Sequence, residues 1–230
     1  MGVVSAVLLI GCAAESSRPS PPSPPPPTVT ASSTTLADSS PAMSWSDSLE
    51  AIEAAGIRAA DGKVSRVGPE LRIQLRNGTT SVFTRDTTPG QYQAPRYSGY
   101  LKELHSYIVH VVPYEGSGNY HIVDDSTGDS TIVWGMPVPS PDGSRFVLTS
   151  QSGEADYDKS VIEVWRMVGR KPENEFSYDS GEDSWDPSNA LWRDSLTIDF
   201  VKNSRIPPYS TSPGRLVRSG TTWAFTEPPH

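Results

Sequence analysis

The chain has 230 residues, a formal net charge of −8 and a pI of about 5.0, and its one cysteine is Cys12. Clustered Lys and Arg are needed to bind nucleic-acid phosphates or anionic lipid headgroups, so this acidic balance argues against a nucleic-acid partner and a polybasic membrane contact. The single cysteine excludes an internal disulfide framework and a zinc site built from several cysteines.

The first residues combine an apolar run with this cysteine. Residues 3–10 are too few for a transmembrane helix, which needs roughly 18–20 apolar residues, but they have the length of a signal-peptide core. They end in Leu9-Ile10-Gly11-Cys12, which resembles the lipobox of bacterial lipoproteins. The resemblance implies a signal peptide over residues 1–11, cleavage after Gly11 and a lipid on the Cys12 thiol.

The residues around this motif bear on where the protein would be anchored. Residues 1–11 carry no charge, whereas signal peptides of that family carry Lys or Arg, and we interpret this as a true start that lies upstream. The alternative is a buried N-terminal strand with a free cysteine. Ala13 stands where an Asp tends to retain Gram-negative lipoproteins at the inner membrane. The resemblance therefore implies the outer membrane, with the protein facing the periplasm.

Residues 12–44 are rich in Pro, Ser and Thr, and seven of the nine residues 19–27 are proline. Such a tract favours a semi-rigid polyproline II spacer, and its Ser/Thr-rich flanks cannot bury enough apolar surface to fold. We predict a disordered linker that holds a folded domain away from the membrane. A ligand for a proline-reading domain is the alternative.

Residues 45–230 are expected to form the folded domain, which begins with one short helix. In the segment "SWSDSLEAIEAAGIRA", the spacing of Leu49, Ile52 and Ala55 predicts one apolar helix face, and Gly56 is expected to end the helix.

The remainder of the domain alternates apolar and polar residues with the period of a β-strand. Leu71, Ile73 and Leu75 share one face, and Asn77-Gly78 then supplies a hairpin turn. "SYIVHVVPY" is apolar on both faces and predicts a central strand, and "YHIVDDSTGDSTIVW" predicts a further hairpin. We count about ten strands joined by short turns, so the expected fold is an all-β antiparallel meander.

The turn Ser140-Pro141-Asp142-Gly143, followed by an aromatic strand, resembles the blades of TolB-type and WD-repeat propellers. At roughly 40–45 residues per blade, the resemblance implies three to four blades over residues 58–230 and thus a small or incomplete β-propeller. The stretch 71–202 also resembles uncharacterised bacterial secreted proteins with an "IWG-P-x-FSPD" pattern. That family implies no activity, and the residues that match its pattern are Ile132, Trp134, Gly135, Pro137, Ser140, Pro141 and Asp142.

Candidate catalytic groups are few. The sequence contains no Gly-x-Ser-x-Gly, no His-Glu-x-x-His and no glycine-rich phosphate-binding motif, and it identifies no catalytic residue. His110 and His121 lie on predicted strands and could approach each other across a hairpin as a catalytic or metal pair. The alternative is two structural histidines within the sheet.

Two acidic segments could supply oxygen ligands for Ca²⁺, although neither has the spacing of an EF-hand loop. The first contains Glu154, Asp156 and Asp158, and the second contains Asp179, Glu182, Asp183 and Asp186. Calcium binding is the hypothesis for the second segment, and a solvated loop is the alternative. Trp185 is expected to be the most exposed of the six tryptophans, as a contact surface or sugar platform, with a loop-anchoring ring as the alternative.

These observations favour a lipid-anchored, non-enzymatic protein of the cell envelope that binds a protein or glycan through its loops and needs no cofactor. One alternative is an envelope hydrolase or lyase that uses the acidic loops and a histidine. Another is a structural component of the envelope without a specific ligand.

Overall fold

The computed structural model of the chain describes residues 45–152, 159–181 and 183–226. The predicted signal peptide, cleavage site, lipidated Cys12 and linker lie outside these residues and stay predictions. No helix within the described ranges is long and apolar enough to cross a membrane.

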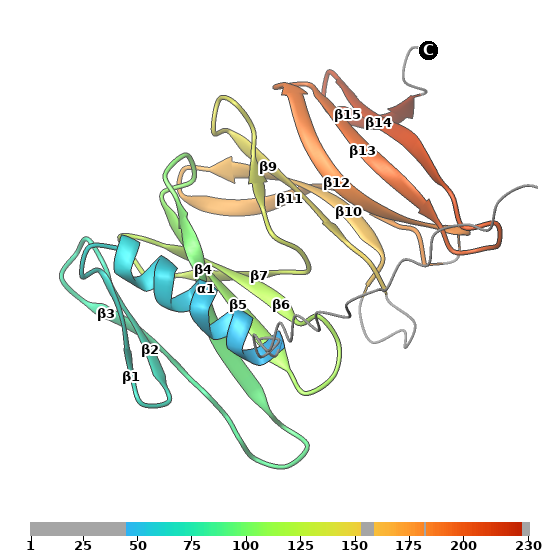
Figure 1. Cartoon of the computed structure of the whole chain (residues 1–230). Helices are drawn as coiled ribbons and strands as arrows, with labels where there is room; N and C mark the ends of the chain where they lie inside the picture. Colours follow the sequence, from blue (N-terminus) through green and yellow to red (C-terminus); the bar gives the residue numbers. More distant parts are fainter. Residues whose placement is uncertain (1–44, 153–158, 182, 227–230) are drawn as a thin grey trace, which may run out of the picture. The chain divides into compact units, whose positions relative to one another are not determined.

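The described residues form four antiparallel sheets, each a meander of strands in chain order (Figure 1). The first sheet contains β1 (Val64–Val67), β2 (Glu70–Gln74) and β3 (Thr80–Thr84). The second contains β4 (Gln93–Leu101), β5 (Ser106–Pro113), β6 (Asn119–Asp124) and β7 (Ser130–Val133). The third contains β8 (Val138–Pro139), β9 (Arg145–Ser150), β10 (Val161–Val168) and β11 (Lys171–Asp179). The fourth contains β12 (Trp185–Asp194), β13 (Thr197–Ser204), β14 (Thr211–Ser219) and β15 (Thr222–Thr226).

The all-β fold class is confirmed, and the four meander sheets match a small or incomplete propeller-like arrangement. The Asn77-Gly78 turn joins β2 to β3, and the predicted central strand is β5, which pairs with β4 and β6. The described residues form fifteen strands, more than the ten or so predicted, and β1, β4 and β11 lie in segments for which no strand was predicted. β4 contains Pro95 and Gly99, and β11 begins Lys171-Pro172, so proline, glycine and charge obscure the alternating pattern in both.

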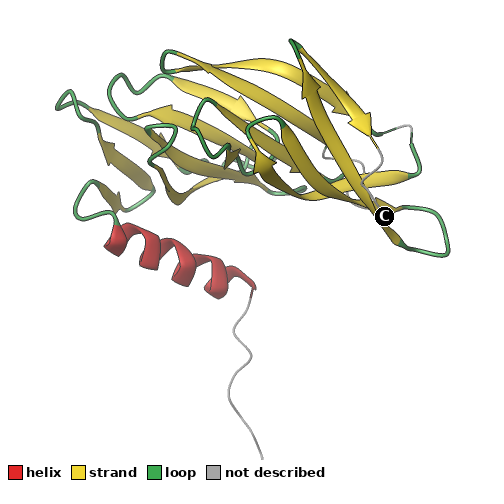
Figure 2. Cartoon of the chain, turned by 90° about the horizontal axis from the view of Figure 1, so that it is seen from above, coloured by secondary structure: helices red, strands yellow, loops and turns green. Residues whose placement is uncertain are grey.

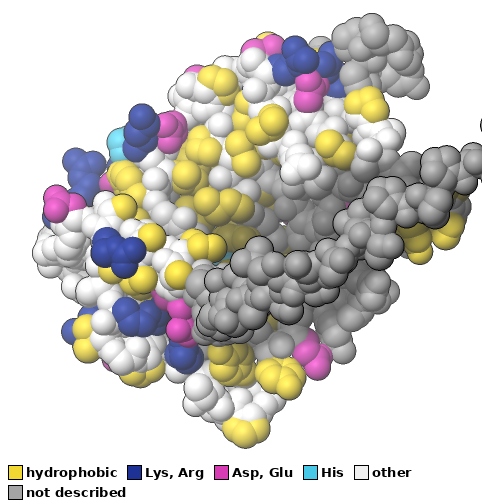
Figure 3. Space-filling model, viewed as in Figure 1, with side chains coloured by type: hydrophobic (Ala, Val, Ile, Leu, Met, Phe, Trp, Pro, Cys, Tyr) yellow, Lys and Arg dark blue, Asp and Glu magenta, His cyan; other side chains and the backbone are white. Residues whose placement is uncertain are grey.

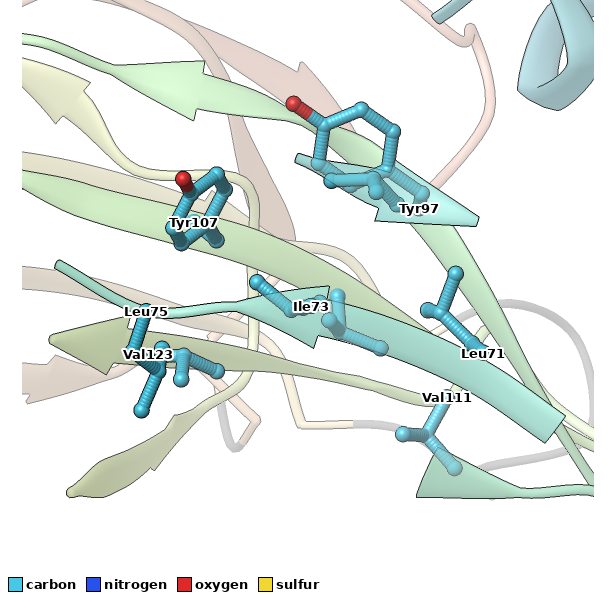
Figure 4. Close-up of a cluster of buried hydrophobic side chains, with 9 residues drawn as sticks. Leu71, Ile73, Leu75, Tyr97, Tyr107, Val111 and Val123 are labelled. Atoms are coloured by element: carbon cyan, nitrogen blue, oxygen red, sulfur yellow. The ribbon is translucent and has the colours of Figure 1, made fainter. Parts of the chain in front are cut away.

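Three buried hydrophobic clusters lie between successive sheets. Leu71 and Ile73 of the first sheet pack with Val111 and Val123 of the second (Figure 4). A second cluster joins β5, β6 and β7 to Phe146 and other residues of the third sheet, and a third joins β9 and β10 to the fourth sheet. Each sheet therefore buries its apolar side chains against its neighbours in chain order, as the blades of a propeller do.

The outer faces of the first and last sheets carry charged side chains. On β2, exposed Arg72 lies between buried Leu71 and Ile73 and pairs with Glu70, with Nη2 and Oε2 2.6 Å apart. On β13, Asp199 accepts hydrogen bonds from Arg193 and Arg215. Both faces are thus suited to water, which is how a stack of sheets can end without closing into a ring.

The one helix among the described residues, α1 (Trp45–Ala59), lies beside the strands (Figure 2), and it differs from the prediction in two ways. It continues through Gly56, where an added Cβ would lie 3.4 Å from the Tyr97 ring, so glycine permits a close approach instead of ending the helix. The predicted apolar face is also wrong, because Ile52 is 67% exposed and Ala55 is exposed. The buried position between them is Glu53, which is 7% exposed.

Glu53 joins the helix to two sheets. Its Oε1 accepts the backbone N–H of Tyr97 on β4 at 2.9 Å and is also paired with Arg66 Nη2 of β1. Arg66 Nη2 in turn donates to the Pro95 carbonyl at 2.6 Å. A buried carboxylate is tolerated only when its charge and lone pairs are satisfied, so this set of contacts explains why a charged residue faces inward.

We expect Glu53→Ala to lower the free energy of unfolding by about 3 kcal/mol, because it leaves the Arg66 guanidinium partly buried without its carboxylate. Glu50→Ala is the matched control, since Glu50 is exposed on the same helix, and it should change stability by less than about 0.5 kcal/mol. Chemical denaturation measures both. Equal losses in the two variants would contradict a special role for Glu53.

Candidate binding cleft

A cleft of about 440 Å³ lies where the end of α1 meets β4 and β5. Three tyrosines line it: Tyr97 and Tyr100 of β4 and Tyr107 of β5. The ring centroids of Tyr100 and Tyr107 are 4.9 Å apart, and those of Tyr97 and Tyr107 are 6.5 Å apart. The remaining lining comes from Gly99 and from the helix end and the turn after it, namely Gly56, Ala59, Ala60, Asp61 and Lys63.

A β-bulge brings the tyrosines to one face. Residues three apart on a regular strand point to opposite faces, so Tyr97 and Tyr100 would be separated by the sheet. The pairing of β4 with β5 shifts between Tyr97 and Gly99, where one extra residue is inserted and Gly99 has a φ of 142°. After the shift, Tyr100 is paired with Tyr107, and both lie on the face that carries Tyr97.

The three hydroxyls differ in their partners. Tyr100 donates to Oδ2 of the buried Asp125 at 2.7 Å, and Tyr107 has a long contact of 3.5 Å with the Gln74 carbonyl. Tyr97 is only 5% exposed, yet its hydroxyl has no hydrogen-bond partner among the described residues. In Figure 4 the hydroxyls of Tyr97 and Tyr107 point away from the aliphatic side chain of Val111. The Tyr97 hydroxyl is therefore free for a ligand.

The surroundings keep these phenols protonated. Burial raises the pKa of Tyr97 to about 12, with a smaller contribution from Tyr107. Burial together with the hydrogen bond to Asp125 raises the pKa of Tyr100 to about 12, and burial also raises the pKa of Tyr107. At neutral pH the three groups thus offer hydroxyls and ring faces and do not act as phenolate bases.

The Asp125 that holds Tyr100 belongs to a charged network at the hairpin ends. Arg170, from the turn between β10 and β11, pairs with Asp125 and also with Asp124, with Nε 2.6 Å from Oδ2 of the latter. The Arg76 backbone N–H, from the β2–β3 turn, donates to the Asp125 carbonyl at 2.6 Å. Burial would raise the pKa of Asp124, but hydrogen bonds from Thr127, Arg170 and Ser126 outweigh it and lower that pKa. The network thus connects the first three sheets.

Two other cavities lie elsewhere on the domain. A cavity of about 490 Å³ borders the Asp124–Arg170 pair, whose polar atoms already bind each other. An open cleft of about 950 Å³ lies between the loops 86–93 and 113–115, and Tyr114 beside it is 82% exposed. We take the smaller tyrosine cleft as the candidate site because it combines aromatic walls with a tyrosine hydroxyl that has no partner among the described residues.

The two histidines do not converge. His110 is paired with Tyr120, whereas His121 is paired with Val109, the residue before His110, so the two imidazoles lie on opposite faces of the sheet. The His110 ring stacks on Tyr120 at 4.3 Å, and the His121 ring packs edge-on against Phe83 at 5.4 Å. Burial lowers the pKa of both. The hypothesis of a histidine pair is therefore wrong, and both rings have structural contacts.

The acidic segment 179–186 is held by its own contacts. Asp179 accepts the Gly181 N–H at 2.8 Å, Asp183 accepts the Tyr178 hydroxyl at 2.5 Å, and Asp186 accepts the Ser160 hydroxyl at 2.5 Å. Glu182, Glu154, Asp156 and Asp158 lie outside the described residues. Across the described ranges, no group of three or more His, Cys, Asp or Glu side chains is placed to hold a metal ion.

Trp185 is half-buried and not freely exposed. Its ring stacks on Tyr178 at 5.8 Å and meets Phe225 edge-on, and Lys202 Nζ lies 4.9 Å from the ring centroid. These contacts place Trp185 in the cluster between the third and fourth sheets. A role in binding stays a prediction for this residue.

The sequence reasoning missed the tyrosine cleft. The available signal was the glycine inside "RYSGYL", because a glycine within a strand often marks a bulge. The sequence does not predict the contribution of α1 to the cleft, because the spacing of its apolar residues indicates the wrong face as the buried one.

The fold and the cleft together define a small propeller-like β protein with a tyrosine-lined cleft beside α1. No protein-family model matches the chain, and no curated protein matches it.

Two variants test the assigned roles of the tyrosine hydroxyls. Tyr100→Phe should lower the free energy of unfolding by about 1–2 kcal/mol, because the buried Asp125 loses a donor. Tyr97→Phe should leave that free energy unchanged or slightly raised, since the hydroxyl it removes has no partner. Denaturant titration of both variants is the measurement. A loss for Tyr97→Phe as large as that for Tyr100→Phe would mean that the Tyr97 hydroxyl has a structural partner.

Proposed function

We propose that this chain is a lipid-anchored binding protein of the cell envelope, and that its β domain takes a ligand in the tyrosine cleft. The observation that carries the binding role is the Tyr97 hydroxyl, which lacks a partner among the described residues in a side chain that is 5% exposed. Because this hydroxyl lines the cleft and has no protein partner, a ligand can pair with it without breaking a hydrogen bond within the protein.

Binding fits the cleft better than proton transfer does. Its phenols have pKa values raised by burial, to about 12 for Tyr97 and Tyr100, so they stay protonated at neutral pH. His110 and His121 do not line the cleft. The lining is aromatic with a few polar groups, which is the usual composition of a small-molecule site.

The proposed location is the outer membrane, with the domain facing the periplasm, and it rests on the sequence Leu9-Ile10-Gly11-Cys12 followed by Ala13. Lipid chains on Cys12 would anchor the protein, since two or more chains hold a protein firmly at a bilayer. The Pro-rich residues 12–44 would keep the domain clear of the surface. The proposed role includes no cofactor and no nucleic-acid partner.

The anchor is tested by Cys12→Ser, expressed in the native host from the chromosomal gene. We expect the unaltered protein to sediment with membranes and to need detergent for release, and the variant to remain in the soluble fraction, because it cannot accept the lipid. Mass spectrometry of the mature N-terminus is the accompanying measurement. An unaltered protein that leaves the membrane without detergent would contradict the proposal.

The binding role is tested by filling the cleft from its helix side. Ala59 is exposed and lines the cleft, whereas Ala54 is exposed on the same helix and does not. We expect Ala59→Arg to abolish retention of a cognate envelope component on immobilised protein, and Ala54→Arg, which adds the same charge, to leave retention intact. Quantitative mass spectrometry of the retained material is the measurement. Retention that both variants preserve would place the binding surface elsewhere.

A further inference from the structure

The cleft offers a balanced set of polar groups. Asp61 and Lys63 contribute one negative and one positive charge to its lining, and neither forms an ion pair with another described residue. Tyr97 also lines the cleft, and its hydroxyl can both donate and accept a hydrogen bond. A ligand that satisfies all three groups needs donors and acceptors but no net charge.

The cleft also offers a fixed aromatic face. The Tyr100 side chain is 41% exposed, although its hydroxyl is anchored on Asp125 at 2.7 Å and its ring contacts that of Tyr107. An anchored ring loses little conformational entropy when a ligand stacks on it. The negative face of such a ring attracts weakly positive C–H groups.

We infer that the cleft binds a neutral pyranose ring of a glycan, an inference that rests on the proposed binding function. The C–H face of the sugar would stack on Tyr100, one hydroxyl would pair with Tyr97, and neighbouring hydroxyls would reach Asp61 and Lys63. The volume of about 440 Å³ accommodates a ligand of this size.

Other ligand classes fit less well. A purely apolar ligand would bury the Tyr97 hydroxyl without a partner, which costs free energy. An anion would be attracted by Lys63 but repelled by Asp61, and the buried Asp125 behind Tyr100 already has its positive partner, Arg170. A ligand rich in neutral hydroxyl groups uses every polar group and the ring face together.

The test uses the full chain carrying Cys12→Ser, so that no lipid interferes. Neutral oligosaccharides of glucose, mannose, galactose and N-acetylglucosamine are titrated against it, with uronic-acid oligosaccharides as anionic members of the panel. Saturation-transfer NMR and calorimetry report binding. We expect a neutral member to bind with a Kd that is insensitive to salt, because no net charge is involved, and with ring-current shifts of its C–H protons.

Tyr97→Phe should then weaken binding of that oligosaccharide about three- to tenfold, the effect of one hydrogen bond, with unchanged thermal unfolding. Tyr114→Phe is the matched control, because it removes the hydroxyl of an exposed tyrosine that does not line the cleft, and it should leave the Kd unaltered. Binding of anionic members alone, binding that Tyr97→Phe leaves unchanged, or no binding by any neutral member at millimolar concentration would each overturn the inference.

The inference and the proposed function fail in different ways. If Ala59→Arg abolishes retention of an envelope component while no neutral sugar binds, the cleft is a binding site for another class of ligand. If Ala59→Arg changes neither retention nor sugar binding, the proposed function of the cleft falls as well.

Discussion

The buried carboxylate of Glu53 is the contact on which the arrangement of helix and sheets depends. β4 is the first strand of its sheet and pairs with β5 alone, so the Tyr97 N–H can donate to Glu53 instead of to a neighbouring strand. Glu53 accepts that N–H and pairs with Arg66 of β1, so one side chain fixes α1 against two sheets. A buried charge is stable only in the geometry that pairs it. The helix therefore has one position against the sheets, and the same contact fixes the shape of the cleft beside it.

Apolar faces alone would hold the sheets together without fixing how they slide past one another. In a stack where each sheet contacts mainly its neighbours, directional contacts must supply that register. Asp124 and Asp125 of the second sheet bind Arg170 of the third, and the Asp125 carbonyl accepts the N–H of Arg76 next to the first. Hydrophobic side chains that remain at the surface form separate groups with charged ones between them on the face shown in Figure 3. Hydrophobic packing thus holds the sheets together, and the polar contacts fix their alignment.

The sequence predicted what depends on local pattern and failed where distant residues decide. The alternation of Leu71, Ile73 and Leu75 and the turn at Asn77-Gly78 are local signals, and the structure confirms them. The helix face was predicted from apolar spacing and was wrong, because Glu53 becomes a buried residue only when Arg66 and β4 surround it. The cleft depends on two further features that involve distant residues: the bulge in β4 and the position of α1 against the sheets. Neither could be derived from the residues one segment at a time.

The bulge explains why a binding cleft arises at this point of a regular fold. An uninterrupted β4 would place Tyr97 and Tyr100 on opposite faces, one inside the core and one between the next pair of sheets. Inserting one residue at Gly99 turns both toward the helix, where Gly56 and the alanines after it are too small to fill the space. A larger side chain at position 56 would meet the Tyr97 ring at 3.4 Å. Two local departures from ideal packing, a bulge in a strand and a glycine within a helix, therefore create a single cavity. Of the three tyrosine hydroxyls that line it, that of Tyr97 has no hydrogen-bond partner among the described residues, whereas those of Tyr100 and Tyr107 do. A fold that needed this region for stability alone would gain by closing it with a larger residue, and the retained opening is the physical argument for a ligand.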